Sequence, residues 1–211
     1  MKSKLSGLYA ITPDIADTSE LLVKVEAALA GGASLLQYRN QIASAALRLV
    51  QARALLTLCR EHAVPLIIND HLDLALAVDA QGLHLGAGDG SVAAARARLG
   101  PGKLLGVSCY RSIENALAAA RDGANYVAFG GFFPSRVKPS AVRTPLSLLG
   151  AAKQQQALPV VAIGGITVDN APGLIAAGAD SLAVISGLFD ARDIQAVARR
   201  FSTLFAARQA P

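Results

Sequence analysis

The sequence is poor in tryptophan, methionine and cysteine. Its 211 residues contain no tryptophan, one methionine and two cysteines. The cysteines, Cys59 and Cys109, stand far apart and lack the close spacing of zinc ligands or of a redox pair. This scarcity excludes a disulfide-stapled secreted scaffold and is typical of a reducing compartment. We therefore expect a cytoplasmic protein in which both thiols are small core residues.

Long uninterrupted apolar runs are also absent. Hydrophobic residues make up 53% of the chain, yet Gly, Asn, Asp or Pro interrupts every apolar run well before the ~18 residues that span a bilayer. Near the start, Thr12, Pro13 and Asp14 break the apolar stretch that a signal peptide would need. The pattern predicts a protein that is not inserted in a membrane and that buries a sizeable core.

Aromatic residues and clustered charges are scarce as well. Aromatics make up 5% of the chain, and the net charge of +5 comes from scattered Lys and Arg residues. Nucleic-acid surfaces typically interleave basic and aromatic side chains, so this composition argues against a nucleic-acid partner. A modest positive charge suits a phosphorylated small molecule, and we expect partners of that kind, with neither nucleic acid nor membrane.

A loose internal repeat organises the chain. Helical stretches end in Gly-Ala and a polar residue at Gly32, Gly123 and Gly178, and an apolar strand follows each time. The candidate strands are Leu8–Ile11, Leu35–Arg39, Leu66–Asn69, Leu83–Leu85, Leu104–Ser108, Tyr126–Gly130, Val160–Ile163 and Leu182–Ile185. Eight strands leave about 26 residues per strand–helix unit, which predicts a single-domain (βα)8 TIM barrel over residues 1–211. The last helix follows the 3.6-residue period from Ile194, with Asp190 as its expected N-cap.

Two carboxylates follow consecutive candidate strands. Asp70 comes directly after the third strand, and Asp89 follows the fourth through a glycine turn. Parallel neighbouring strands end at the same edge of a sheet, so both acids should meet there. Carboxylate oxygens are ligands that Mg²⁺ prefers, and the pattern therefore predicts a magnesium site. His84, inside the fourth strand, is interpreted as a packed core histidine rather than a ligand.

Glycine turns follow the seventh and eighth candidate strands. The first contains Gly164 and Gly165, and the second contains Ser186 and Gly187. In barrels of this type, such turns expose backbone N–H groups that bind phosphate. The alternative is that these glycines serve only the tight turns between strand and helix.

Eight motifs give the chain a family resemblance, and their order and spacing carry it. They run from Gly7 to about Ala191 and read GLYAITPD, QYRN, PLIIND, GLHLGAGD, LLGVSCY, YVAFGGFFPSRVKP, VVAIGGIT and LAVISGLFD. This set resembles the thiamine-phosphate synthase family. The resemblance implies a (βα)8 barrel enzyme that joins a hydroxymethylpyrimidine diphosphate to a thiazole phosphate, forming thiamine phosphate and releasing pyrophosphate.

The resemblance also assigns roles to individual residues. It implies Mg²⁺ as the cofactor, held by Asp70 and Asp89, and catalytic roles for Arg39, Ser108 and Lys138. The substrate-binding residues that it implies are Gln37, Tyr38, Arg39, Asn40, Gln41, Asn69, Ser108 and Lys138 around the pyrimidine diphosphate, and Ser135, Val137, Gly165, Ile185 and Ser186 around the thiazole phosphate. In the family the diphosphate leaves first, and the thiazole nitrogen captures the resulting cation.

Two positions depart from the family pattern. Gln41 stands where the family usually has a lysine, and Val137 stands where it usually has a hydroxyl residue; Arg136 is close enough in sequence to supply a replacement cation. These departures motivate one alternative, a weakened, non-catalytic paralogue that binds thiamine intermediates. A second alternative is a thiazole tautomerase-like isomerase on the same fold. The sequence leaves the oligomeric state open, with a homodimer as one option.

Overall fold

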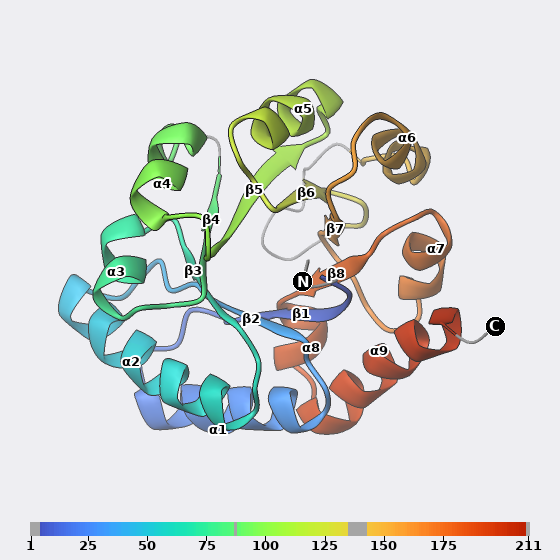
Figure 1. Cartoon of the computed structure of the whole chain (residues 1–211). Coiled ribbons are helices and arrows are strands. Elements are labelled where there is room, and N and C mark those ends of the chain that lie inside the picture. Colours follow the sequence, from blue (N-terminus) through green and yellow to red (C-terminus); the bar gives the residue numbers. More distant parts are fainter. Residues whose placement is uncertain (1–4, 87, 135–142, 210–211) are drawn as a thin grey trace.

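The computed structural model describes residues 5–86, 88–134 and 143–209, and within them eight parallel strands form a closed barrel (Figure 1). The strands are β1 (Gly7–Ile11), β2 (Leu35–Tyr38), β3 (Leu66–Asn69), β4 (Gly82–Leu85), β5 (Leu104–Tyr110), β6 (Tyr126–Gly130), β7 (Val160–Ile163) and β8 (Ser181–Val184). Each strand pairs with the next, and β1 pairs with β8 to close the barrel. The predicted (βα)8 barrel is confirmed.

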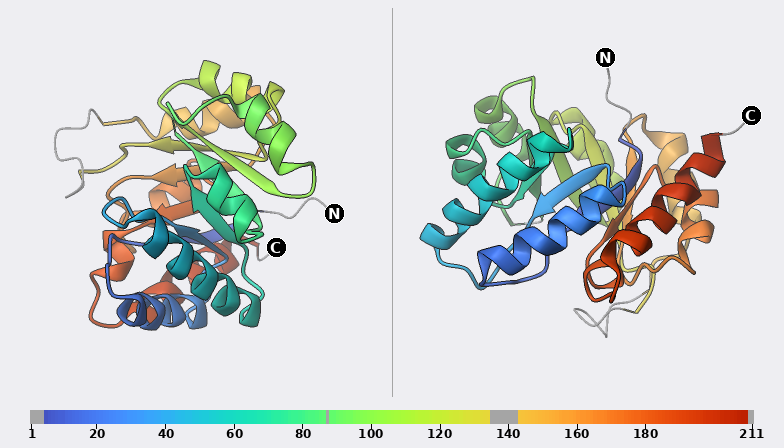
Figure 2. Two further views of the ribbon diagram at one scale, coloured as in Figure 1. Left: turned by 90° about the vertical axis from the view of Figure 1, so that its left-hand side faces the viewer. Right: turned by 90° about the horizontal axis from the view of Figure 1, so that it is seen from below.

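Helices surround the barrel on its outer side, as the views along and across its axis show (Figures 1 and 2). They are α1 (Thr18–Ala30), α2 (Ala45–Glu61), α3 (Leu72–Ala77), α4 (Val92–Leu99), α5 (Ile113–Arg121), α6 (Ser147–Gln155), α7 (Ala171–Ala176), α8 (Ser186–Phe189) and α9 (Ile194–Gln209). None of the described helices has the length and apolar character needed to cross a membrane.

Short polar side chains fix where several helices begin. Ser44 caps α2 by accepting the backbone N–H of Leu47, and such caps satisfy groups that the helix itself leaves without partners. The predicted cap of the last helix was wrong by three residues. Asp193 accepts the N–H of Ala196 at the start of α9, whereas Asp190 follows the last residue of α8. The reason is the short helix α8, which the apolar pattern did not reveal.

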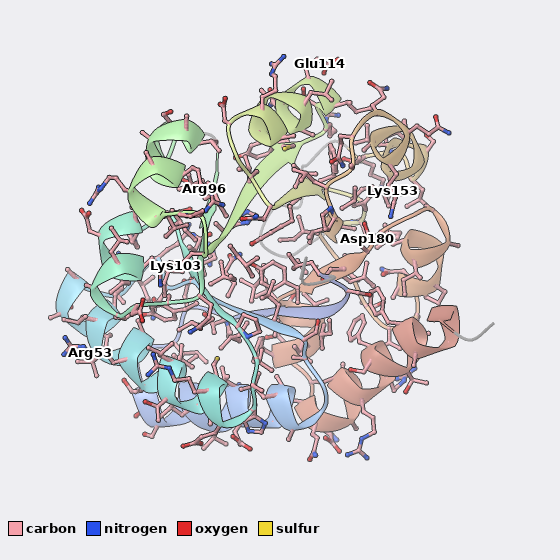
Figure 3. All side chains as sticks on the ribbon, viewed as in Figure 1. Arg53, Arg96, Lys103, Glu114, Lys153 and Asp180 are labelled. Carbon is pink, nitrogen blue, oxygen red and sulfur yellow. The ribbon has the colours of Figure 1, made fainter. Side chains whose placement is uncertain are left out.

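Two apolar regions lie on opposite faces of the strands, because successive side chains of a strand point to opposite sides. The larger region lies between strands and helices and contains Cys59 and Cys109. Both thiols are buried and free, as predicted, and burial raises the pKa of each to about 12. The smaller region fills the barrel interior and includes Tyr9, Tyr126 and Val161. Figure 3 shows that side chains fill the space between the strands and the surrounding helices.

Gly106 on β5 makes room for one of the two tyrosine rings of the barrel interior. A Cβ atom built at this position would lie 2.0 Å from the ring of Tyr126 on the neighbouring strand β6. The fully buried Tyr126 ring therefore occupies the volume that any other residue at Gly106 would need.

Candidate active site

The segment after β2 is held in place by residues from the end of β1. The Thr12 hydroxyl accepts the backbone N–H of Arg39 at 2.9 Å and donates to the Arg39 carbonyl at 2.7 Å. The Asp14 carboxylate pairs with the Arg39 guanidinium at 3.2 Å and accepts the N–H of Gln41 at 2.7 Å. Asp14 thus holds the Arg39 guanidinium and the backbone at Gln41 in place at the mouth of the barrel.

A cavity of about 290 Å³ opens at the ends of β2 and β3. Its lining includes six residues that the sequence predicted for the site, Tyr38, Arg39, Asn40, Gln41, Asn69 and Asp70. It also includes Ile68 and two polar residues that were not predicted, Arg48 on α2 and His71 before α3. Cationic and anionic groups therefore face the same space.

Two of the predicted substrate contacts have side chains that are committed to the protein. The Tyr38 hydroxyl donates to Gln51 at 2.8 Å, and burial raises the pKa of Tyr38 to about 12. The Asn40 amide donates to Ile15 and Gln51, and its oxygen accepts the N–H of Ala43. Because these groups already have partners, Tyr38 and Asn40 can offer the cavity mainly backbone atoms.

Asp70 and Asp89 approach each other as the strand order predicted. Burial, together with a hydrogen bond and the negative charge of Asp89, raises the pKa of Asp70 to about 6, although the Arg39 charge acts in the opposite direction. Asn69 donates to the Asp70 carboxylate at 2.6 Å, and the N–H of Gly86 donates to the Asp89 carboxylate at 2.7 Å. Asp70 has a φ of 60°, in the left-handed region that side chains other than Asn, Asp and Gly disfavour.

This carboxylate pair fits a divalent cation. Burial is the largest cause of the raised pKa of Asp70, and the repulsion from Asp89 adds to it; a cation between the two acids would relieve that repulsion. In the described part of the chain, no group of three or more His, Cys, Asp or Glu side chains is arranged to hold a metal ion. Two carboxylates with further oxygens from substrate phosphates and water are the usual environment of Mg²⁺, which needs no larger protein cage.

A chain of hydrogen bonds crosses the barrel interior and joins two predicted site residues. Gln37 donates to the hydroxyl of Tyr9 at 2.7 Å, and that hydroxyl lies 2.8 Å from the hydroxyl of Tyr126. Tyr126 lies 3.1 Å from Nδ1 of His84, and Nε2 of His84 lies 2.9 Å from the hydroxyl of Ser108. His84 is therefore a buried core histidine, as predicted, and it connects the ends of β2 and β5.

The protons of this chain have two consistent arrangements. Gln37 donates to Tyr9, whereas either hydroxyl can donate in the bond between Tyr9 and Tyr126. Burial lowers the pKa of His84 to about 4, so its ring is neutral and carries a single proton. With that proton on Nε2, His84 accepts from Tyr126 and donates to Ser108; with it on Nδ1, the donor and acceptor roles in both bonds are reversed.

Replacing Tyr126 with phenylalanine should cut this chain and lower the free energy of unfolding by about 1–3 kcal/mol. The expected loss arises because the buried groups of Tyr9 and His84 would each lose a hydrogen-bond partner while the ring still fills its space. Urea denaturation followed by circular dichroism measures it. A variant as stable as the wild type would show that the chain contributes nothing to folding.

The glycine turns lie at the ends of β7 and β8. Gly165 has a φ of +63°, and a Cβ atom there would lie 2.3 Å from the carbonyl oxygen of Pro134. Asn170 donates to the Gly165 carbonyl at 3.0 Å and fixes the turn. Ile185 directly precedes α8, and Ser186 is its first residue, where helical N–H groups have no partner within the helix.

Three predicted site residues, Ser135, Val137 and Lys138, lie outside the described residues, as does Arg136. The remaining predicted residues all lie at the carboxyl ends of the strands, the end where barrel enzymes carry their chemistry. Gln37, Arg39, Asn69, Asp70, Asp89 and Ser108 come from the adjacent strands β2 to β5 or the turns after them, and Gly165, Ile185 and Ser186 from the ends of β7 and β8.

Comparison with known proteins identifies one family. Residues 8–188 match the family described as thiamine monophosphate synthase. A thiamine-phosphate synthase of Nitrosomonas eutropha is 54% identical over 202 residues, covering 96% of this chain and 95% of the relative. One from Methylobacillus flagellatus is 56% identical over 201 residues, covering 95% and 96%. The structure of thiamine phosphate pyrophosphorylase from Pyrococcus furiosus superimposes with a TM-score of 0.86 at 33% identity, covering 99% of both chains.

Proposed function

This chain belongs to the thiamine monophosphate synthase family, and from that membership we propose how its own residues carry out the reaction. The protein is a transferase that joins hydroxymethylpyrimidine diphosphate to thiazole phosphate, giving thiamine phosphate and pyrophosphate. The observation that carries the assignment of residues is the cavity where Arg39 lies beside Asp70. Cations and carboxylates around one space suit a diphosphate bound together with a metal ion.

Asp70 and Asp89 are the residues that would hold Mg²⁺. The hydrogen bond from Asn69 orients the Asp70 carboxylate, and the N–H of Gly86 orients that of Asp89. When bound, the ion neutralises negative charge that builds up on the departing diphosphate. The repulsion between the two carboxylates supports this proposal, because a cation bound between them would replace it with attraction to both.

The pyrimidine diphosphate would lie between β2 and β5. Arg39 pairs with its phosphate oxygens, and Asn69 contacts it beside the metal ligands. Gln37 and Ser108, at the two ends of the buried hydrogen-bond chain, contact the pyrimidine from the side of the barrel interior. Tyr38, Asn40 and Gln41 contribute backbone atoms or, for Gln41, an uncharged side chain at the cavity wall.

The thiazole phosphate would lie on the opposite side of the mouth. Gly165, Ile185 and Ser186 surround its phosphate through backbone N–H groups and the Ser186 hydroxyl, as the glycine turn and the start of α8 suggest. The proposal also assigns Ser135 and Val137 to this phosphate and Lys138 to the diphosphate, all outside the described residues.

The chemistry needs charge stabilisation and positioning more than acid or base catalysis. The bond between the pyrimidine methylene carbon and the diphosphate oxygen breaks, and the electron pair leaves with pyrophosphate. The lone pair of the thiazole nitrogen then forms the new carbon–nitrogen bond. Arg39 and Lys138 stabilise the negative charge of the leaving group, and the two subsites hold nitrogen and carbon in line.

Incubating the purified protein with both phosphorylated substrates and Mg²⁺ should yield thiamine phosphate, and removing the metal with EDTA should abolish turnover until Mg²⁺ is added back. Chromatography of the product measures this. Full activity in EDTA would contradict the metal assignment. No turnover with intact binding of the thiazole phosphate would instead favour a non-catalytic paralogue. The naming of relatives above 50% identity as synthases already argues against the isomerase alternative.

The compartment is also part of the proposal. We place the enzyme in the cytoplasm, where its two free and buried cysteines suit a reducing environment.

A further inference from the structure

Arg48 brings a second cation to the cavity that holds Arg39 and Asp70. It lies near the start of α2, four residues after the Ser44 cap, and lines the cavity of about 290 Å³ described above. Its Nε–H donates to the backbone carbonyl of Asn40 at 3.1 Å. This bond anchors the guanidinium at the cavity wall and leaves its terminal amino groups for other partners.

The charges of the two arginines are balanced differently. Arg39 has the Asp14 carboxylate at 3.2 Å. Arg48 has no carboxylate within ion-pair distance among residues 5–86, 88–134 and 143–209. A half-buried cation without a counter-charge is stabilised when an anion enters the space.

We propose that Arg48 binds the terminal phosphate of the diphosphate substrate. The inference rests on the proposed function, which places the diphosphate in this cavity. A guanidinium can meet two phosphate oxygens at once, and Arg48 borders the cavity together with Gln41, where the chain has an uncharged side chain. Arg48 thus supplies a positive charge that Gln41 does not.

The experiment measures binding of inorganic pyrophosphate in the presence of Mg²⁺ by calorimetry, together with the KM of each substrate. Arg48→Gln should weaken pyrophosphate binding and raise the KM for the diphosphate substrate by about 10- to 100-fold, with the KM for thiazole phosphate unchanged. Adding Gln41→Lys to the Arg48→Gln variant should recover about tenfold in pyrophosphate binding and in the KM of the diphosphate substrate. This recovery distinguishes a charge contact from a structural role.

Arg53→Gln is the matched control, because Arg53 lies on the same helix and points outward (Figure 3). It should bind pyrophosphate as the wild type does. Equal binding by the wild type and Arg48→Gln overturns the inference. If Arg48→Gln does not fold, Arg48→Lys decides: about 3- to 10-fold weaker binding supports the contact, and unchanged binding refutes it. A wild type that neither binds pyrophosphate nor forms thiamine phosphate would refute the proposed function instead.

Discussion

Replacing Asp70 with asparagine should lower kcat by about three powers of ten at saturating Mg²⁺, equal to about 4 kcal/mol of activation free energy. Asparagine keeps the shape of the side chain but removes the negative charge that would hold the metal beside the leaving diphosphate. Steady-state kinetics over a range of Mg²⁺ concentrations measures the effect. Near-normal turnover would refute Asp70 as a metal ligand.

The thermal stability of Asp70→Asn, unlike its kcat, should not fall when the metal is absent. Asp70 is partly buried against the Asp89 carboxylate, and its φ of 60° is a conformation that asparagine also adopts readily. The variant should therefore melt at the same or a higher temperature than the wild type in EDTA, although it is far less active. A large fall in melting temperature would mean that the lost activity reflects misfolding.

Asp73→Asn is the matched control for this variant. Asp73 lies three residues further along, and its exposed carboxylate pairs at the surface with Arg98. Exposed pairs of this kind contribute little, so activity and stability should both stay close to those of the wild type. The comparison separates the charge at the carboxylate pair from the general loss of an acid in this region.

Replacing Gly106 with alanine should lower the free energy of unfolding by about 3 kcal/mol and the melting temperature by about 6–12 °C. The added methyl group would meet the Tyr126 ring at 2.0 Å, far inside contact distance, and the ring is fully buried. Its displacement would also pull the hydroxyl away from Tyr9 and His84. Calorimetry measures the shift in melting temperature.

Gly102→Ala tests whether the loss belongs to that contact rather than to a glycine being replaced. Nothing lies within 4 Å of a Cβ atom at Gly102, just before β5. Alanine also restricts the unfolded chain, so this variant should be as stable as the wild type or slightly more so. Equal losses from both substitutions would contradict the packing argument.

The strands and the carboxylate pair could be predicted because their signals are local. Short apolar runs that end at glycine or polar residues predict the strands, and the position of Asp70 follows from the end of β3. The predicted limits differ from the observed ones where tertiary pairing decides. On β5 the strand continues to Tyr110 past a shift in register against β6, which no pattern of apolar residues announces.

Other parts of the site depend on contacts between segments distant in sequence. Asp14 follows β1, and no local pattern connects it with the next strand, yet its carboxylate pairs with Arg39 and accepts the N–H of Gln41. In the sequence, Arg48 looks like any other arginine on a helix. It lines the cavity because the loop from β2 to α2 places the start of α2 beside the end of β2. The hydrogen-bond chain through Tyr9 and Tyr126 required the closed barrel, because its members come from β1, β2, β4, β5 and β6.

The pairing of β1 with β8 has a consequence for how the chain matures during synthesis. Gly7 accepts a hydrogen bond from the Ser181 hydroxyl, across nearly the whole length of the sequence. Until residues 181–184 have left the ribosome, β1 and β7 each present a row of backbone groups without a partner. Such open edges invite pairing between chains. Nascent or prematurely terminated chains that end before β8 are therefore the species that need protection by chaperones, whereas the finished barrel offers no edge to a neighbour.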